Sequence, residues 1–287
     1  MESRIERVGV VGCGLMGSGI AEVCARAGLE VRVVEVDGNS SRAGRRRVES
    51  SLERGVASKK ISVSDSEQAL SRIGFGIDFD ALFDVDLVIE AVVESEDEKV
   101  EVFARVDKVV DNRAAVLASN TSSIPIMKLA MATRRPERVV GIHFFNPVPV
   151  LPLVEVVSSL MTSPETLNGA ADFAGRVLGK HVIHSKDRAG FIVNALLVPY
   201  LLSAIRMFES GFATAEDIDA GMTKGCAHPM GPLALTDLVG LDTTMAVANS
   251  LYEEFKEPLY APPPLLARMV EAGLLGRKSG RGFYDYS

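Results

Sequence analysis

Short apolar runs alternate with amphipathic segments over the first two thirds of the chain. The apolar runs predict strands at residues 8–12, 31–34, 85–90, 115–118, 139–142, 153–157 and 180–184. An amphipathic helix is expected after the first run, as far as about Ala27, where Gly28 can end it. Strands that alternate with helices in this way predict an α/β fold with a doubly wound, mostly parallel sheet covered on both faces.

The pattern changes after about residue 186, where no further strand is evident and apolar helical segments follow. Thr214, with acidic residues directly after it, predicts the start of one of these helices. We therefore expect two domains, an α/β domain over 1–185 and an all-helical domain over 186–287.

The longest apolar stretch, 189–205, raises the question of a membrane span. It is slightly short for that purpose, and Asn194 and Pro199 interrupt it. A helix that is apolar on nearly all sides also suits the centre of a helical domain. We favour the second interpretation and expect no membrane association.

Composition narrows the class of protein further. The chain has 287 residues, of which 47% are hydrophobic and 24% charged, so it is expected to fold. A net charge of -7 argues against nucleic-acid binding. The three cysteines have neither metal-ligand spacing nor a paired framework, so we expect reduced thiols and no metal. The polar N-terminus, 1–7, shows no secretory signal, and a cytoplasmic location is expected.

A glycine-rich segment lies between the first expected strand and the helix after it. In Gly12-Cys-Gly-Leu-Met-Gly17, the three glycines suit a tight turn, a close approach to a pyrophosphate and helix packing, respectively. Glu35 follows the second strand, 18 positions after Gly17, and can accept from ribose hydroxyls. This arrangement predicts a Rossmann-type dinucleotide site, against the alternative of the same fold without a ligand. The expected cofactor-binding residues here are Gly12, Gly14, Leu15, Met16, Gly17 and Glu35.

Charges near this segment bear on which dinucleotide binds. The carboxylate of Glu35, with Asp37 beside it, should repel a ribose 2′-phosphate and so favours NAD. Arg32 and the arginines from Arg42 onward are able to pair with such a phosphate instead, which leaves NADP possible.

Residues 42–60 are strongly basic. Seven Lys or Arg residues against two Glu give a local excess of five positive charges. A solvated helix face is one interpretation, because charge runs usually are solvated. A site for an anionic ligand is the other, and a coenzyme A nucleotide carries the phosphates that would fit.

His143 directly follows the expected strand 139–142, at the edge where open α/β sheets bind ligands. Histidine changes charge near neutral pH, and alcohol oxidation beside a nicotinamide requires a proton acceptor. Glu155 is the lone charge in the apolar strand 153–157, and a buried carboxylate is costly unless it is paired. We expect Glu155 to orient His143 as in a catalytic triad. The alternatives are a structural histidine and a Glu155 that faces water.

Taken together, these motifs resemble those of the L-3-hydroxyacyl-CoA dehydrogenases, in particular the short, stand-alone 3-hydroxybutyryl-CoA type. The likeness runs through nearly the whole chain. Its landmarks are Gly12-Cys-Gly-Leu-Met-Gly17, Ser119-Asn-Thr-Ser-Ser123, His143-Phe-Phe-Asn-Pro147, Gly190-Phe-Ile-Val-Asn194, Pro229-Met-Gly-Pro232, Val239-Gly-Leu-Asp242 and Gly280-Arg-Gly-Phe-Tyr284.

The resemblance implies roles for individual residues. His143 would be the general base, Glu155 its orienting carboxylate, and Ser122 and Asn194 the groups that contact the reacting oxygen. Glu94, Lys99 and Ser122 would contact the cofactor, and Ser51 and Lys59, with Ser122 and Asn194, the acyl-CoA. It also implies a homodimer formed through the helical domain.

The function expected from residues and resemblance is reversible, NAD-dependent oxidation of an (S)-3-hydroxyacyl-CoA to a 3-ketoacyl-CoA in fatty acid metabolism. Two alternatives stay open. One is a dehydrogenase of a small free hydroxy acid, which would not need the basic segment 42–60. The other is a non-catalytic protein that binds a dinucleotide, which would need no base.

Overall fold

The computed structural model describes residues 5–286. The chain divides into two compact units, the first ending at Arg188 and the second beginning at Ala189.

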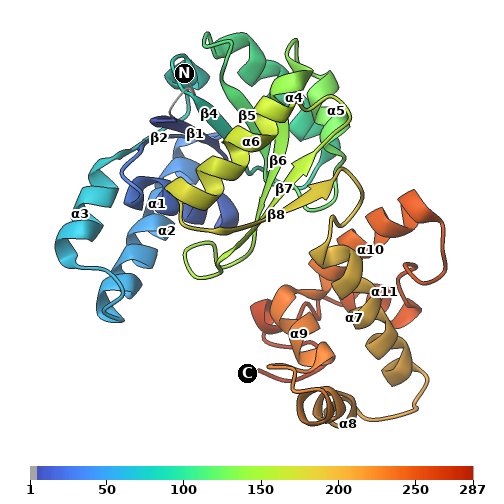
Figure 1. Ribbon diagram of the computed structural model, residues 1–287. Coiled ribbons are helices and arrows are strands. Elements are labelled where there is room, and N and C mark those ends of the chain that lie inside the picture. Colours follow the sequence, from blue (N-terminus) through green and yellow to red (C-terminus); the bar gives the residue numbers. More distant parts are fainter. Residues whose placement is uncertain (1–4, 287) are drawn as a thin grey trace. The chain divides into compact units, whose positions relative to one another are not determined.

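The first unit is built on one eight-stranded sheet with the order β3-β2-β1-β4-β5-β6-β7-β8 (Figure 1). All neighbouring strands are parallel except β6 and β7, which are antiparallel. The strands are β1 (Arg7–Val11), β2 (Glu30–Val34), β3 (Ile73–Gly76), β4 (Leu87–Glu90), β5 (Val116–Ser119), β6 (Val139–Phe144), β7 (Leu153–Ser158) and β8 (His181–Lys186). The strands β1 to β3 are added in one direction across the sheet, and β4 is added on the other side of β1, as in a Rossmann fold.

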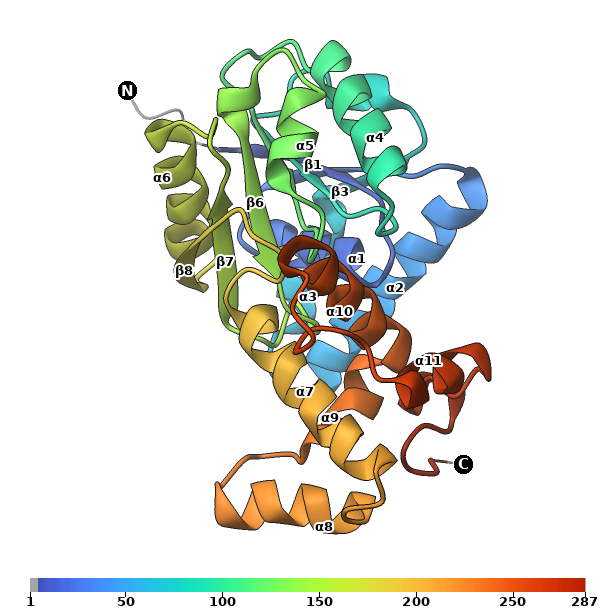
Figure 2. The ribbon, with the colours of Figure 1, turned by 90° about the vertical axis from the view of Figure 1, so that its right-hand side faces the viewer.

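Helices cover both faces of this sheet. They are α1 (Leu15–Arg26), α2 (Gly38–Ala57), α3 (Val63–Ser71), α4 (Glu96–Val109), α5 (Ile126–Met131) and α6 (Pro164–Asp172). Alternate strand residues such as Ile89 and Ile142 share a core with side chains of α1, α2 and α6. Val88 lies on the opposite face, against Phe103 of α4. Figure 2 shows α4 and α5 beside each other, with α6 on the other side of β6 and β7.

Two local features differ from the sequence expectation. His143 lies inside β6 rather than after it, because the strand continues to Phe144. The pattern also missed β3, since its sequence Ile-Gly-Phe-Gly has two glycines and no apolar run.

The second unit is helical, with α7 (Val193–Glu209), α8 (Ala215–Ala220), α9 (Pro232–Val239), α10 (Leu241–Phe255) and α11 (Pro264–Glu271). The expected helix start at Thr214 is confirmed, because its side chain accepts a hydrogen bond from the amide of Asp217. The apolar stretch 189–205 forms most of α7, and Leu202 and Ile205 are buried in the core of this unit. Within residues 5–286, no helix is both long and apolar enough to cross a membrane. The predicted fold class is confirmed.

Candidate active site

The glycine-rich segment forms a tight loop between β1 and α1. Gly12 has a φ of +87°, and a Cβ there would lie 2.7 Å from the carbonyl oxygen of Ala91. A Cβ on Gly17 would lie 1.9 Å from the carbonyl oxygen of Gly12, so α1 can begin here only if this residue is glycine. A Cβ on Gly14 would meet nothing within 4 Å, which leaves the backbone open on that side.

Glu35, at the end of β2, holds this loop. Its carboxylate accepts hydrogen bonds from the amides of Cys13 and Val36. Burial, with the charge of Glu35 added, raises the pKa of the Cys13 thiol to about 12, so this thiol stays protonated at neutral pH. Arg32, which sequence reasoning left available for a phosphate, instead donates to Asp84 at 2.7 Å.

A hollow of about 550 Å³, here called the dinucleotide hollow, opens at the carboxyl ends of β1, β2 and β4. Its lining includes Gly12, Gly14, Glu35, Ser40, Arg47 and Phe79. The uncovered Gly14 backbone, the start of α1 and a carboxylate at the ribose position are the elements that a bound NAD requires. The residues present therefore fit this cofactor.

His143 and Glu155 are direct partners across the antiparallel β6–β7 pair. The Nδ1 atom of His143 donates to Oε2 of Glu155 at 2.7 Å, with His143 4% exposed and Glu155 fully buried. This bond places the proton of a neutral imidazole on Nδ1, which leaves the Nε2 lone pair as the acceptor. Nε2 lies 3.2 Å from the hydroxyl oxygen of Ser122. The three side chains thus present one basic nitrogen and one hydroxyl at the carboxyl end of β6.

Glu94 holds the loop that carries Ser122. Its Oε1 atom accepts from the amides of Ser122 and Ser123, at 3.0 and 3.1 Å, and from the hydroxyls of Thr121 and Ser123. Desolvation acts to raise the pKa of Glu94, but the charge of Lys99 and these hydrogen bonds outweigh it, so the pKa is lowered. Glu94 is therefore a carboxylate at neutral pH.

Lys99 is buried rather than facing a hollow. Its ammonium contacts Oε1 of Glu90 at 2.6 Å and Oε2 of Glu94 at 3.3 Å, and both Lys99 and Glu90 are 1% exposed. The other oxygen of Glu90 accepts from the hydroxyl of Ser119 at 2.6 Å. Lys99 therefore positions Glu94 and the loop after β5.

Sequence reasoning missed two residues of this network. One is Glu90, which the sequence marks only as a charged residue at the end of an apolar strand. In the sheet it lies directly beside Ser119 of β5. The other is Asn120, whose Oδ1 accepts from the amide of Phe144 at 2.9 Å and ties the Ser122 loop to the His143 strand.

A second hollow of about 550 Å³, here called the basic groove, lies beside α2. Its lining includes Ser51 and also Arg46, Arg47, Arg54 and residues 146–149. Lys59 is not among the lining residues, because α2 ends at Ala57 and the chain turns away with a φ of 57° at Lys59.

The remaining predicted residues are Leu15, Met16 and Asn194, of which Leu15 lines the basic groove. Leu15 and Met16 form the first turn of α1, and Leu15 is exposed. Asn194 lies in the first turn of α7, in the second unit. Among residues 5–286, no group of three or more His, Cys, Asp or Glu side chains is placed to hold a metal ion.

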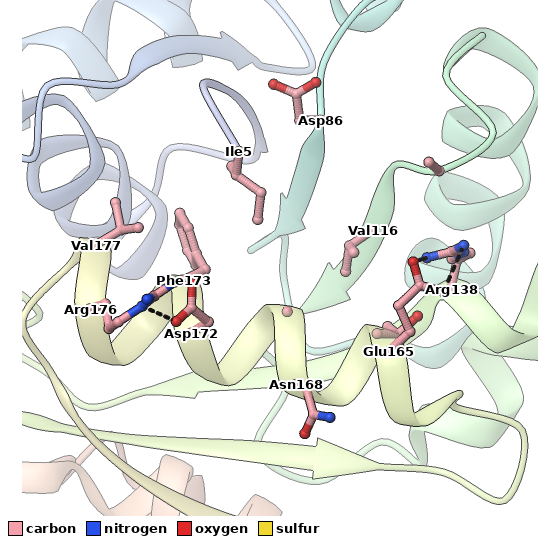
Figure 3. Close-up of a pocket in the computed structure, with 13 residues that line it drawn as sticks. Ile5, Asp86, Val116, Arg138, Glu165, Asn168, Asp172, Phe173, Arg176 and Val177 are labelled. Carbon is pink, nitrogen blue, oxygen red and sulfur yellow. Dashed lines mark hydrogen bonds and ion pairs between the residues drawn. The ribbon is translucent and has the colours of Figure 1, made fainter. Parts of the chain in front are cut away.

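A larger hollow, of about 830 Å³, lies at the amino ends of the strands, between the starts of β4 to β6 and α6 (Figure 3). The residues that the structure describes around it include none of the predicted site residues. Its charged side chains Arg138 and Arg176 pair with Glu165 and Asp172. Size alone therefore does not mark the site in this molecule.

A Rossmann sheet with a dinucleotide loop and a carboxylate-bound histidine at its carboxyl edge defines the class of NAD-dependent dehydrogenases. The family comparisons agree. Residues 7–188 match the model of the 3-hydroxyacyl-CoA dehydrogenase NAD binding domain, and residues 190–286 match that of the C-terminal domain. The chain belongs to the 3-hydroxyacyl-CoA dehydrogenase family. It is an oxidoreductase, and its cofactor is NAD.

Individual relatives cover the whole chain. A 3-hydroxybutyryl-CoA dehydrogenase of Mycobacterium tuberculosis is 60% identical over 286 residues, covering 100% of both chains. The crystal structure of M. tuberculosis FadB2 has a TM-score of 0.98 at 60% identity and covers 99% of this chain and 100% of its own. That of the (S)-3-hydroxybutyryl-CoA dehydrogenase PaaH1 from Ralstonia eutropha has a TM-score of 0.93 at 46% identity, with the same coverage.

Proposed function

We propose that the chain catalyses the reversible oxidation of short-chain (S)-3-hydroxyacyl-CoA, such as 3-hydroxybutyryl-CoA, to the 3-ketoacyl-CoA in the fatty acid metabolism of the cytoplasm. The family and the names of the relatives support the substrate class. The observation that carries the proposal is the hydrogen bond from Nδ1 of His143 to Glu155, with Nε2 directed at Ser122.

The residues would act as follows. Nε2 of His143 takes the proton of the 3-hydroxyl group as the C3–H bond breaks, and Glu155 stabilises the imidazolium that forms. The hydroxyl of Ser122 helps to hold the reacting oxygen, and Asn194 has the same role by resemblance. NAD would supply the acceptor for the hydride that leaves C3. In the reverse direction, protonated His143 returns its proton to the ketone oxygen.

The binding residues divide by ligand. Gly12, Gly14, Leu15, Met16, Gly17 and Glu35 would hold NAD, with Glu94 and Ser122 towards its nicotinamide half and Lys99 acting through Glu94. Ser51 and the arginines of the basic groove would hold the CoA nucleotide; the resemblance gives Lys59 the same role, although it does not line the groove. Residues 1–185 would form the NAD-binding domain, and 186–287 the substrate and dimerisation domain.

The test of the reaction is the oxidation of NADH and NADPH with acetoacetyl-CoA, a longer 3-ketoacyl-CoA and free acetoacetate compared side by side. We expect the highest kcat/KM with NADH and acetoacetyl-CoA. Equal rates with free acetoacetate would indicate a dehydrogenase of free hydroxy acids. Tight NADH binding without turnover of any substrate would indicate a non-catalytic binding protein.

The test of the base is His143→Ala. Turnover should fall about 10²–10⁴-fold, because that is what general base catalysis typically contributes. NADH affinity, measured by fluorescence titration, should stay near that of the wild type. Glu155→Gln should lower turnover less, since the imidazole remains. Near-normal turnover of His143→Ala would remove this residue from the mechanism.

A further inference from the structure

Three consecutive arginines on α2 differ in what they face. Arg45 donates from Nε to Glu49 at 2.8 Å and lines neither hollow. Arg46 lines the basic groove but not the dinucleotide hollow. Arg47 lines both the basic groove and the dinucleotide hollow. The same charge therefore stands in three different settings within one turn of helix.

The position of Arg47 follows from how α2 packs on the glycine-rich loop. A Cβ on Gly44 would lie 2.7 Å from Cβ of Cys13, so the helix approaches the loop this closely only at a glycine. One turn of the helix brings Arg47 to the same side as Gly44. Its Nη1 atom donates to the carbonyl oxygen of Cys13 at 3.3 Å, which holds the guanidinium beside the loop.

The backbone of Cys13 is hydrogen-bonded to two side chains of opposite charge. Its amide donates to the carboxylate of Glu35, and its carbonyl accepts from Arg47. The guanidinium has further N–H donors beyond the one that the Cys13 carbonyl takes. Arg47 thus carries both a fixed anchor in the protein and donors for an anion on either side.

We propose that Arg47 is a shared phosphate anchor, which contacts the pyrophosphate-bearing part of NAD on one side and that of the acyl-CoA on the other. This inference rests on the proposed function, because that function assigns a nucleotide diphosphate to each hollow. A guanidinium suits the task, since its planar donor set matches phosphate oxygens and it keeps its charge. One residue would then fix both ligands relative to the glycine-rich loop.

The three arginines supply a matched experiment. Arg45→Met, Arg46→Met and Arg47→Met each remove one positive charge from an exposed stretch of one helix. The dissociation constants of NADH alone and of CoA alone are measured for the full-length protein by calorimetry at low and high salt. Circular dichroism melts verify that each variant is folded.

We expect Arg47→Met to raise the dissociation constants of NADH and of CoA by roughly tenfold each, as for the loss of one charge-assisted hydrogen bond. Arg46→Met should lower the affinity for CoA alone, and Arg45→Met should leave the affinity for both ligands unchanged. The Arg47→Met loss should shrink at high salt, because salt screens exposed charges. Arg47→Lys, which keeps the charge but not the planar donors, should recover part of both affinities.

The outcomes separate this inference from the proposed function. If Arg46→Met weakens CoA but Arg47→Met weakens NADH alone, Arg47 only supports the loop through Cys13 and the shared role is wrong. A loss of CoA affinity alone in Arg47→Met likewise overturns it. If CoA does not bind the wild type, or if Arg46→Met leaves CoA affinity unchanged, the assignment of the basic groove to CoA fails, and the inference fails with it.

Discussion

Glu90 and Lys99 form an ion pair with almost no exposure to water. Burying two charges costs more than their attraction usually returns, so such a pair is weak evidence for stability alone. Here the pair also holds Ser119 and, through Lys99, Glu94. We interpret its value as positional, because the loop that carries Ser122 depends on both carboxylates.

Glu90→Gln tests this interpretation. The amide removes the closer of the two carboxylates that neutralise the buried ammonium of Lys99, so we expect a loss of about 3 kcal/mol in the free energy of unfolding. Turnover should fall as well, since Ser122 and His143 would no longer be held together. Urea unfolding and steady-state kinetics measure the two effects. The matched control is Glu96→Gln, in the exposed pair with Lys128, which should cost at most about 0.5 kcal/mol. Equal effects of the two substitutions would contradict the positional role.

How far single residues could be predicted depended on their surroundings in the sequence. Glu155 was conspicuous because apolar residues flank it on both sides, and the contact predicted with His143 is present. Glu90 ends its strand, where a carboxylate usually meets water, and its burial depends on β4 lying between β1 and β5. That information belongs to the sheet and is absent from the local pattern.

At the scale of elements, β6 and β7 explain why His143 and Glu155 meet. The connection between Phe144 and Leu153 is too short for a parallel crossover, which needs a dozen or more residues, so the strands must be antiparallel. Antiparallel pairing then sets Glu155 directly opposite His143. The sequence predicted both strands, but their direction follows from loop length, which strand periodicity does not report.

A second contact between elements joins the end of α4 to the loop before β6. Asp107 accepts from Nε of Arg135 at 2.7 Å and from Nε of Arg134 at 2.8 Å, and the Asp107 and Arg135 side chains are both buried. Desolvation acts to raise the pKa of Asp107, but the arginine hydrogen bonds outweigh it, and the pKa lies below its usual value.

Asp107→Asn should therefore destabilise the protein in a pH-dependent way. At neutral pH we expect a loss of about 3–5 kcal/mol, because Arg135 stays buried without its counter-charge. A carboxyl group with a lowered pKa contributes its stability above its unfolded pKa of about 3.9 and loses it as the pH falls through the folded value. The difference between variant and wild type should thus shrink in urea titrations below about pH 4. Arg134→Met, which removes the exposed partner, is the control and should cost much less. A difference that is constant with pH would argue that Asp107 acts by packing alone.

At the scale of the whole molecule, the sequence predicted the fold class and the change from α/β to helical structure, because strand and helix periodicities differ clearly. It did not predict how α7 divides its apolar surface. The pattern suggested a helix buried on nearly all sides, whereas Leu196 is 73% exposed beside the buried Val198 and Leu202. This exposed apolar side chain on the helical unit is a place at which the homodimer implied by the family resemblance can be tested.

Leu196→Glu is the test of that assembly. A wild-type homodimer through the helical unit should elute in light-scattering chromatography at twice the 30.8 kDa mass of one chain. A charge in the centre of an apolar interface costs several kcal/mol when it is buried without a partner, so the variant should shift towards monomer on dilution. Leu160→Glu is the matched control, because Leu160 is 95% exposed but lies in the first unit, and it should leave the mass unchanged. If both variants and the wild type have the same mass, α7 does not form the interface. If Leu160→Glu alone dissociates, the dimer forms through the Rossmann unit instead.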